Sequence, residues 1–131
     1  MNKLRYGLAS LAVFIFVAVF EGIFHGKFLA GIYAQTAELW RPAGEMNTPV
    51  IVFAQLMFSF VFGFIFTKGY ENKGIMEGVR YGILIGLLAI PCHLVSYAVQ
   101  PLPIQLAILW SVGGLIEMIL AGAILAAVYR R

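Results

Sequence analysis

The sequence has few charged residues and a single cysteine. Of its 131 residues, 11% are charged and 62% are hydrophobic, and the mean hydropathy is +0.93. A water-soluble domain of this size is excluded, because it could not bury so much apolar surface. Cys92 alone excludes an intrachain disulfide and a dithiol relay. The chain also lacks a serine–histidine pairing, an HExxH motif and a glycine-rich phosphate loop, so we expect no enzyme.

The most prominent feature of the sequence is a set of long apolar runs. A helix needs roughly 20 residues to cross a bilayer, and four apolar runs are long enough to do so. They cover residues 6–26, 49–67, 81–99 and 104–128. Within lipid the backbone must satisfy its own hydrogen bonds, which favours helices over strands. The sequence therefore predicts an all-α integral membrane four-helix bundle, forming one domain over 1–131. The first run is longer than the apolar region of a signal peptide, so we expect a retained helix.

Basic residues are concentrated at one end of the expected bundle. Seven of the nine lie at the N-terminus, between the second and third helices, or at the C-terminus: Lys3, Arg5, Lys68, Lys73, Arg80, Arg130 and Arg131. The positive-inside rule then places both termini in the cytoplasm. The rule also accounts for the net charge of +3, so the expected partner is the lipid bilayer and no nucleic acid.

The stretch between the first two helices, 27–48, is too apolar for an ordinary loop. Small residues recur every four positions at Gly22, Gly26, Ala30 and Ala34. We therefore expect helix one to extend into an outer interfacial helix that stops before the sequence WRP, since a residue preceding proline avoids helical angles.

Ionisable side chains within the apolar runs are the candidates for function, because a charge at that depth is costly and normally faces the bundle interior or a water-filled cavity. They are Glu21, His25, His93 and Glu117. Counted from the helix ends, Glu21, Gln55 and His93 share one level about 9 to 11 Å below the outer boundary. Glu117 lies nearer the midplane.

Helical spacing places these residues on one polar stripe per helix. We expect the stripes to converge on an outward-opening cavity, with a ligand or proton site formed by Glu21, Gln55, His93, Tyr97 and Glu117. His25 lies about one turn nearer the surface, where we expect it to be solvated and to mark only the mouth of the cavity.

Several kinds of site stay open at this point. Two histidines and two carboxylates could hold a divalent transition metal, at Glu21, His25, His93 and Glu117. His25 and His93 could instead be axial ligands of a haem within the bundle. A carboxylate at mid-membrane with a histidine above it would also suit proton-coupled transport.

An accessory role is the remaining alternative. Gly78, Gly82 and Gly86 form a stripe of small residues that suits docking on a second copy, or on a partner in a larger membrane complex, as well as internal packing.

Two resemblances add to these readings. Helix one, with Glu21, resembles that of the small multidrug resistance transporters, four-helix chains with one essential helix-one glutamate, which implies antiport of hydrophobic cations. The long outer segment and the buried histidines depart from that pattern. The string of Glu21, His25, Tyr33 and the sequence LWRP is similar to a family of small four-helix bacterial membrane proteins without an assigned activity. That similarity implies a bacterial inner-membrane location.

Overall fold

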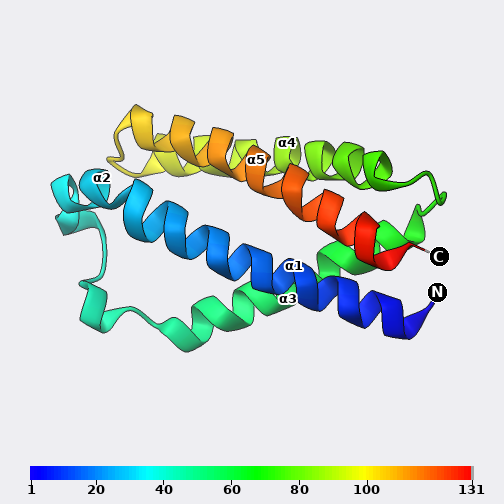
Figure 1. The fold of residues 1–131 in the computed structure, drawn as a ribbon. Coiled ribbons are helices and arrows are strands. Elements are labelled where there is room, and N and C mark those ends of the chain that lie inside the picture. The colour runs from blue at the N-terminus through cyan, green and yellow to red at the C-terminus, as the bar shows by residue number, and fades with distance from the viewer. Residues whose placement is uncertain (131) are drawn as a thin grey trace.

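The computed structural model describes residues 1–130, which form helices and turns and no β-strand. Four helical spans within this range are long and apolar enough to cross a membrane. They are built on α1 (Lys3–Ile23), α3 (Thr48–Lys68), α4 (Ile75–Val99) and α5 (Ile104–Tyr129). Successive spans run in opposite directions and both chain termini lie at one end (Figure 1). The predicted all-α four-helix membrane architecture is confirmed.

The two ends of the bundle differ in what connects the helices. We call the end with both termini and the turn at 69–74 the terminal end, and the end with 24–47 and 100–103 the distal end. At the terminal end α4 begins at Ile75, earlier than the predicted residue 81. Within the first turn of α4, the Glu77 carboxylate accepts the backbone N–H groups of Glu71 and Lys73 at 2.6 and 2.7 Å, which fixes the preceding turn against the start of the helix. Hydropathy alone does not register such a contact.

The distal segment is helical but not one continuous helix. The course of α1 passes through a π-helical turn, Phe24–Phe28, bends at Leu29, and resumes as α2 (Ala30–Gln35). Leu29 is fully buried in a distal core with Leu102 and Leu106, which ties the bend to the end of the α4–α5 hairpin. Single 3₁₀ turns follow at Ala37–Leu39 and Ala43–Glu45. The helical course stops before the WRP sequence, as predicted.

Helices α4 and α5 pack closely through glycines. A Cβ atom on Gly78 would overlap the backbone carbonyl of Gly122, and one on Gly82 would overlap that of Met118. Gly78, Gly82 and Gly86 are all buried. The glycine stripe on α4 is therefore occupied by α5 within the molecule, so it does not form a free docking face. A homo-oligomer or a partner protein stays a prediction.

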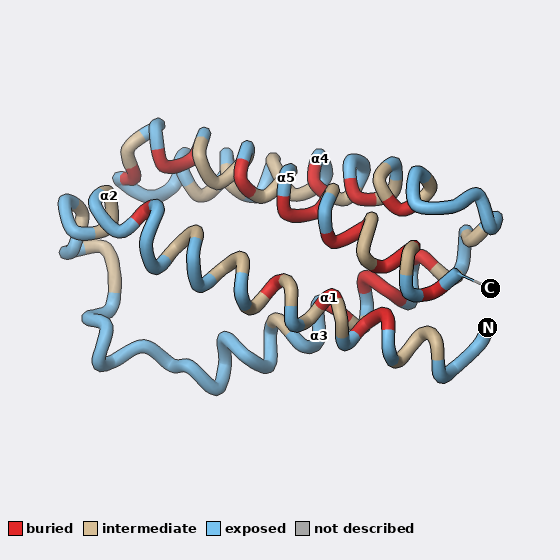
Figure 2. Tube along the Cα trace, in the orientation of Figure 1, coloured by how far each residue is buried: buried red, intermediate tan, exposed pale blue. Residues whose placement is uncertain are grey.

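Helix α3 joins the bundle mainly at the terminal end. Buried residues concentrate there, whereas the distal half of α3 is largely exposed (Figure 2). The Tyr6 hydroxyl donates to the Phe60 carbonyl at 2.8 Å, and the Tyr81 hydroxyl donates to the Phe62 carbonyl at 2.6 Å. Toward the distal end α3 diverges from α1 (Figure 1). A cavity lies between the helices in this distal half of the bundle.

Candidate functional site

A cavity of about 550 Å³ lies between α1, α3, α4 and α5 in the distal half of the bundle. Its polar lining residues are Glu21, His25, Gln55, His93 and Glu117. Four of the five residues predicted for a ligand or proton site thus meet at one cavity. The structure does not bring Tyr97 to it, because that side chain is exposed on α4.

The remaining walls of the cavity are apolar. They consist of aliphatic, aromatic and small residues from all four helices: Val17, Phe24, Ile51, Ala54, Phe58, Ala89, Trp110, Gly114 and Met118. Phe24 packs against α5 where Gly113 has no side chain, since a Cβ there would overlap the Phe24 ring. That close approach brings the Glu21 face of α1 up to the Glu117 face of α5.

Glu21 and His25 are joined by a direct contact. They lie one helical turn apart, and His25 Nε2 is 2.7 Å from Glu21 Oε2. His25 belongs to the π-helical turn Phe24–Phe28, a conformation that is rare in proteins and frequent at functional sites. The side chain of His25, which we expected to be solvated at the cavity mouth, is 39% exposed and also contacts Glu21.

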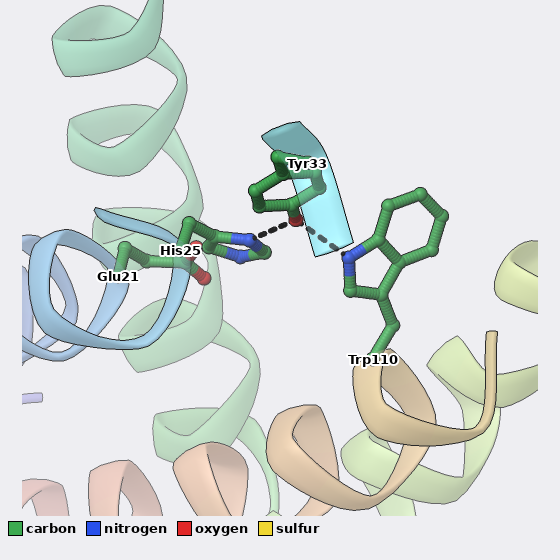
Figure 3. A network of polar contacts seen from close by, with 4 residues as sticks. All are labelled: Glu21, His25, Tyr33 and Trp110. Atoms are coloured by element: carbon green, nitrogen blue, oxygen red, sulfur yellow. Dashed lines mark hydrogen bonds and ion pairs between the residues drawn. The ribbon is translucent and has the colours of Figure 1, made fainter. Parts of the chain in front are cut away.

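Two aromatic residues continue this contact into a network (Figure 3). The Trp110 indole N–H donates to the Tyr33 hydroxyl at 2.8 Å, and that hydroxyl lies 2.6 Å from His25 Nδ1. Because indole can only donate, Tyr33 is free to donate its own proton to a neutral His25. The Nε2–H of His25 then donates to Glu21. In this arrangement, each hydrogen bond of the network donates in the direction of the Glu21 carboxylate.

The Tyr33 hydroxyl is protected from ionisation. Burial raises its pKa above the ordinary value, and the nearby Glu21 charge adds to this effect, while the hydrogen bond from Trp110 opposes it. Tyr33 is therefore a stable donor to His25 at neutral pH. No signal in the sequence indicated this role of Tyr33, because the contact with His25 depends on the bend at Leu29.

Glu117 approaches Glu21 from α5. Both carboxyl groups line the same cavity. Ionised carboxylates can only accept hydrogen bonds, so any hydrogen bond between the two groups would require one shared proton. Glu117 is 5% exposed, and its Oε1 atom is buried without a hydrogen-bond partner. Glu21 therefore has a hydrogen-bond donor in His25, whereas one carboxyl oxygen of Glu117 has no hydrogen-bond partner.

The network also bears on the haem and metal hypotheses. Both ring nitrogens of His25 are already engaged, with Glu21 and with Tyr33, so an axial bond to iron would require one of them to be lost. Within residues 1–130, no three His, Cys, Asp or Glu side chains are grouped to hold a metal ion. The arrangement of His25, Glu21 and Tyr33 fits hydrogen bonding better than ligation.

The fold and the cavity define a small multi-pass membrane protein with polar groups gathered inside an apolar helical bundle. No protein-family model matches the chain, and searches of curated proteins and of solved structures give no match.

Proposed function

We propose that the protein binds a small organic cation at the carboxyl pair of Glu21 and Glu117. The observation that supports this function is that Glu21 and Glu117 line one cavity whose other walls, apart from His25, Gln55 and His93, are apolar. Two adjacent carboxylates repel each other unless a proton or a cation lies between them. A bound cation would replace the shared proton and let both groups ionise.

The walls of the cavity suit such a ligand. The rings of Phe24, Phe58 and Trp110 line it, and aromatic faces attract quaternary ammonium groups. A compact cation with an apolar substituent would meet negative charge at the carboxyl pair, and its substituent would contact the aromatic and aliphatic walls. Glu21 would act as the fixed anion, because His25 donates to it. Glu117 would act as the exchangeable group.

Binding without catalysis is the better account of the remaining polar groups. The hydroxyls of Ser59 and Ser111 donate to carbonyls of their own helices, Gln55 and Ala107, at 2.8 Å. Cys92 is exposed and does not line the cavity. The Ser59 and Ser111 hydroxyls and the Cys92 thiol are thus not placed as nucleophiles beside His93 or His25, which favours binding over covalent catalysis.

Titration calorimetry with benzyltrimethylammonium, on the protein purified in a mild detergent, tests this function. We expect saturable binding that releases a proton, measured by repeating the titration in buffers of different ionisation enthalpy. Glu21→Gln and Glu117→Gln should each weaken binding by more than about tenfold, since each removes a charge that the cation contacts. Glu117→Gln should also abolish proton release.

Glu45→Gln provides the matched control, because Glu45 is exposed in the distal segment and does not line the cavity. It should bind the cation as the wild type does. Equal affinity in all four proteins would contradict the proposed site.

A further inference from the structure

A second, apolar groove adjoins the cavity. It has a volume of about 360 Å³ and lies between α3 and α4, lined by Ala54, Met57, Phe58, Val61, Phe62, Ile65, Tyr81 and Ile85. Ala54 and Phe58 line both spaces. The groove and the cavity of the carboxyl pair therefore meet at these two residues.

The chemistry of the groove is that of hydrocarbon. Its one polar side chain, Tyr81, already donates its hydroxyl to the Phe62 carbonyl at 2.6 Å. No side chain of the groove is left to recognise a polar group. Along α3 the lining runs from Ala54 to Ile65, about 16 Å at the rise of an α-helix. This length suits an extended alkyl chain.

The groove is open to the surroundings of the bundle. Met57, Val61 and Ile65 are 58%, 47% and 48% exposed on the outer surface of α3. A hydrophobic chain could thus enter sideways from the bilayer. The groove extends from the carboxyl pair, in the distal half, toward the terminal end. The alkyl chain of a ligand would therefore point from its head group toward the middle of the bilayer. The tails of lipids in the leaflet at the distal end point in the same direction.

We infer that the ligand of this protein is a single-chain amphiphilic cation, with its ammonium group at Glu21 and Glu117 and its alkyl chain in the groove between α3 and α4. This inference rests on the proposed function and adds the tail to it. Charge complementarity selects the head group: a phospholipid would bring a phosphate toward two carboxyl groups, and like charges repel. The α3–α4 groove supplies the apolar contact.

The test is a chain-length series measured by displacement of benzyltrimethylammonium from protein in lipid nanodiscs. In the wild type, decyltrimethylammonium should bind at least tenfold more tightly than hexyltrimethylammonium. Val61→Trp fills the groove from α3 and should remove that gain while leaving benzyltrimethylammonium binding unchanged. Val52→Trp places the same ring on α3 outside both spaces, at a residue of similar exposure (43%), and should keep the gain.

This design separates the groove from simple partitioning into lipid, because partitioning is the same for every variant. Retained binding of benzyltrimethylammonium shows that a variant is folded. Should Val61→Trp lose it, Ile85→Trp fills the same groove from α4 and is measured in its place. Decanol, which has the chain without the charge, should displace nothing.

An equal chain-length gain in Val61→Trp or Ile85→Trp and in the wild type would overturn the inference, as would displacement by decanol. Failure of benzyltrimethylammonium itself to bind the wild type would instead overturn the proposed function.

Discussion

Tyr33 connects two parts of the chain through one hydroxyl group. It accepts from Trp110, 77 positions away, and contacts His25 within the same segment. Its ring also packs against that of Trp40, with centroids 5.3 Å apart. The position of Tyr33 therefore couples the distal segment to the carboxyl pair, since His25 is the residue that supports Glu21.

Replacing Tyr33 with phenylalanine should destabilise the protein. It leaves the Trp110 N–H and His25 Nδ1 without their partner, at a cost of about 1 to 3 kcal/mol in the free energy of unfolding. Unfolding in mixed detergent micelles measures the loss at pH 7. Tyr97→Phe is the control: that hydroxyl is exposed and has no hydrogen bond within residues 1–130, so stability should not change.

The difference in stability between the wild type and Tyr33→Phe should also depend on pH. Because the pKa of Tyr33 is raised in the folded state, its contribution to stability is complete below the ordinary pKa of 10 and falls as pH rises further. The stability difference between the wild type and Tyr33→Phe should therefore narrow above about pH 10. A difference that grew with pH would contradict the burial of this hydroxyl beside Glu21 and His25.

At the scale of elements, the α4–α5 hairpin depends on glycines and not on large side chains. In lipid, close backbone approach takes the place of the hydrophobic effect as the source of helix association. Gly82 lies against the Met118 backbone and Gly78 against Gly122. Since Glu117 is the neighbour of Met118 on α5, this packing also fixes the depth and direction of the Glu117 side chain.

Gly82→Ala should separate α4 from α5. The added Cβ would overlap the Met118 carbonyl, so we expect a loss of about 1 to 3 kcal/mol in the free energy of unfolding. Gly7→Ala on α1 is the matched control, because a Cβ there meets no other atom within 4 Å. That variant should keep its stability or gain up to about 1 kcal/mol from helix propensity. Equal behaviour of the two variants would contradict the packing.

At the scale of the whole molecule, the bundle is closed at the terminal end and divided at the distal end. The terminal core includes Val13, Phe62, Leu125 and Tyr129, all at most 5% exposed. The distal half instead contains the cavity. A bundle packed equally along its length would leave no space between Glu21 and Gln55. The divergence of α3 is thus the property that makes a binding site possible.

The orientation of the bundle can be tested with single cysteines. Six of the eight basic residues within residues 1–130 lie at the terminal end, so that end should face the cytoplasm. After replacement of the exposed Cys92 by serine, a cysteine at Glu45 should react with a membrane-impermeant maleimide in intact cells. A cysteine at Asn72 should react only after permeabilisation. The opposite labelling pattern would show that the orientation is reversed.

The sequence by itself determined the four spans and the common side of the termini, and it predicted the depth of Glu21, Gln55, His93 and Glu117. The physical reason is that these properties are local. Hydropathy is a sum along the chain, and a helix in lipid satisfies its backbone within its own segment. Depth then follows from counting residues at a fixed rise.

Only the tertiary structure decided which polar groups touch. The approach of Glu117 to Glu21 depends on Phe24 fitting over Gly113, and the contact of Tyr33 with His25 depends on the bend at Leu29. Neither packing event leaves a periodic signal in the sequence, because each joins segments through side-chain shape. The groove between α3 and α4 is a further product of packing, since it forms where two helices fail to close.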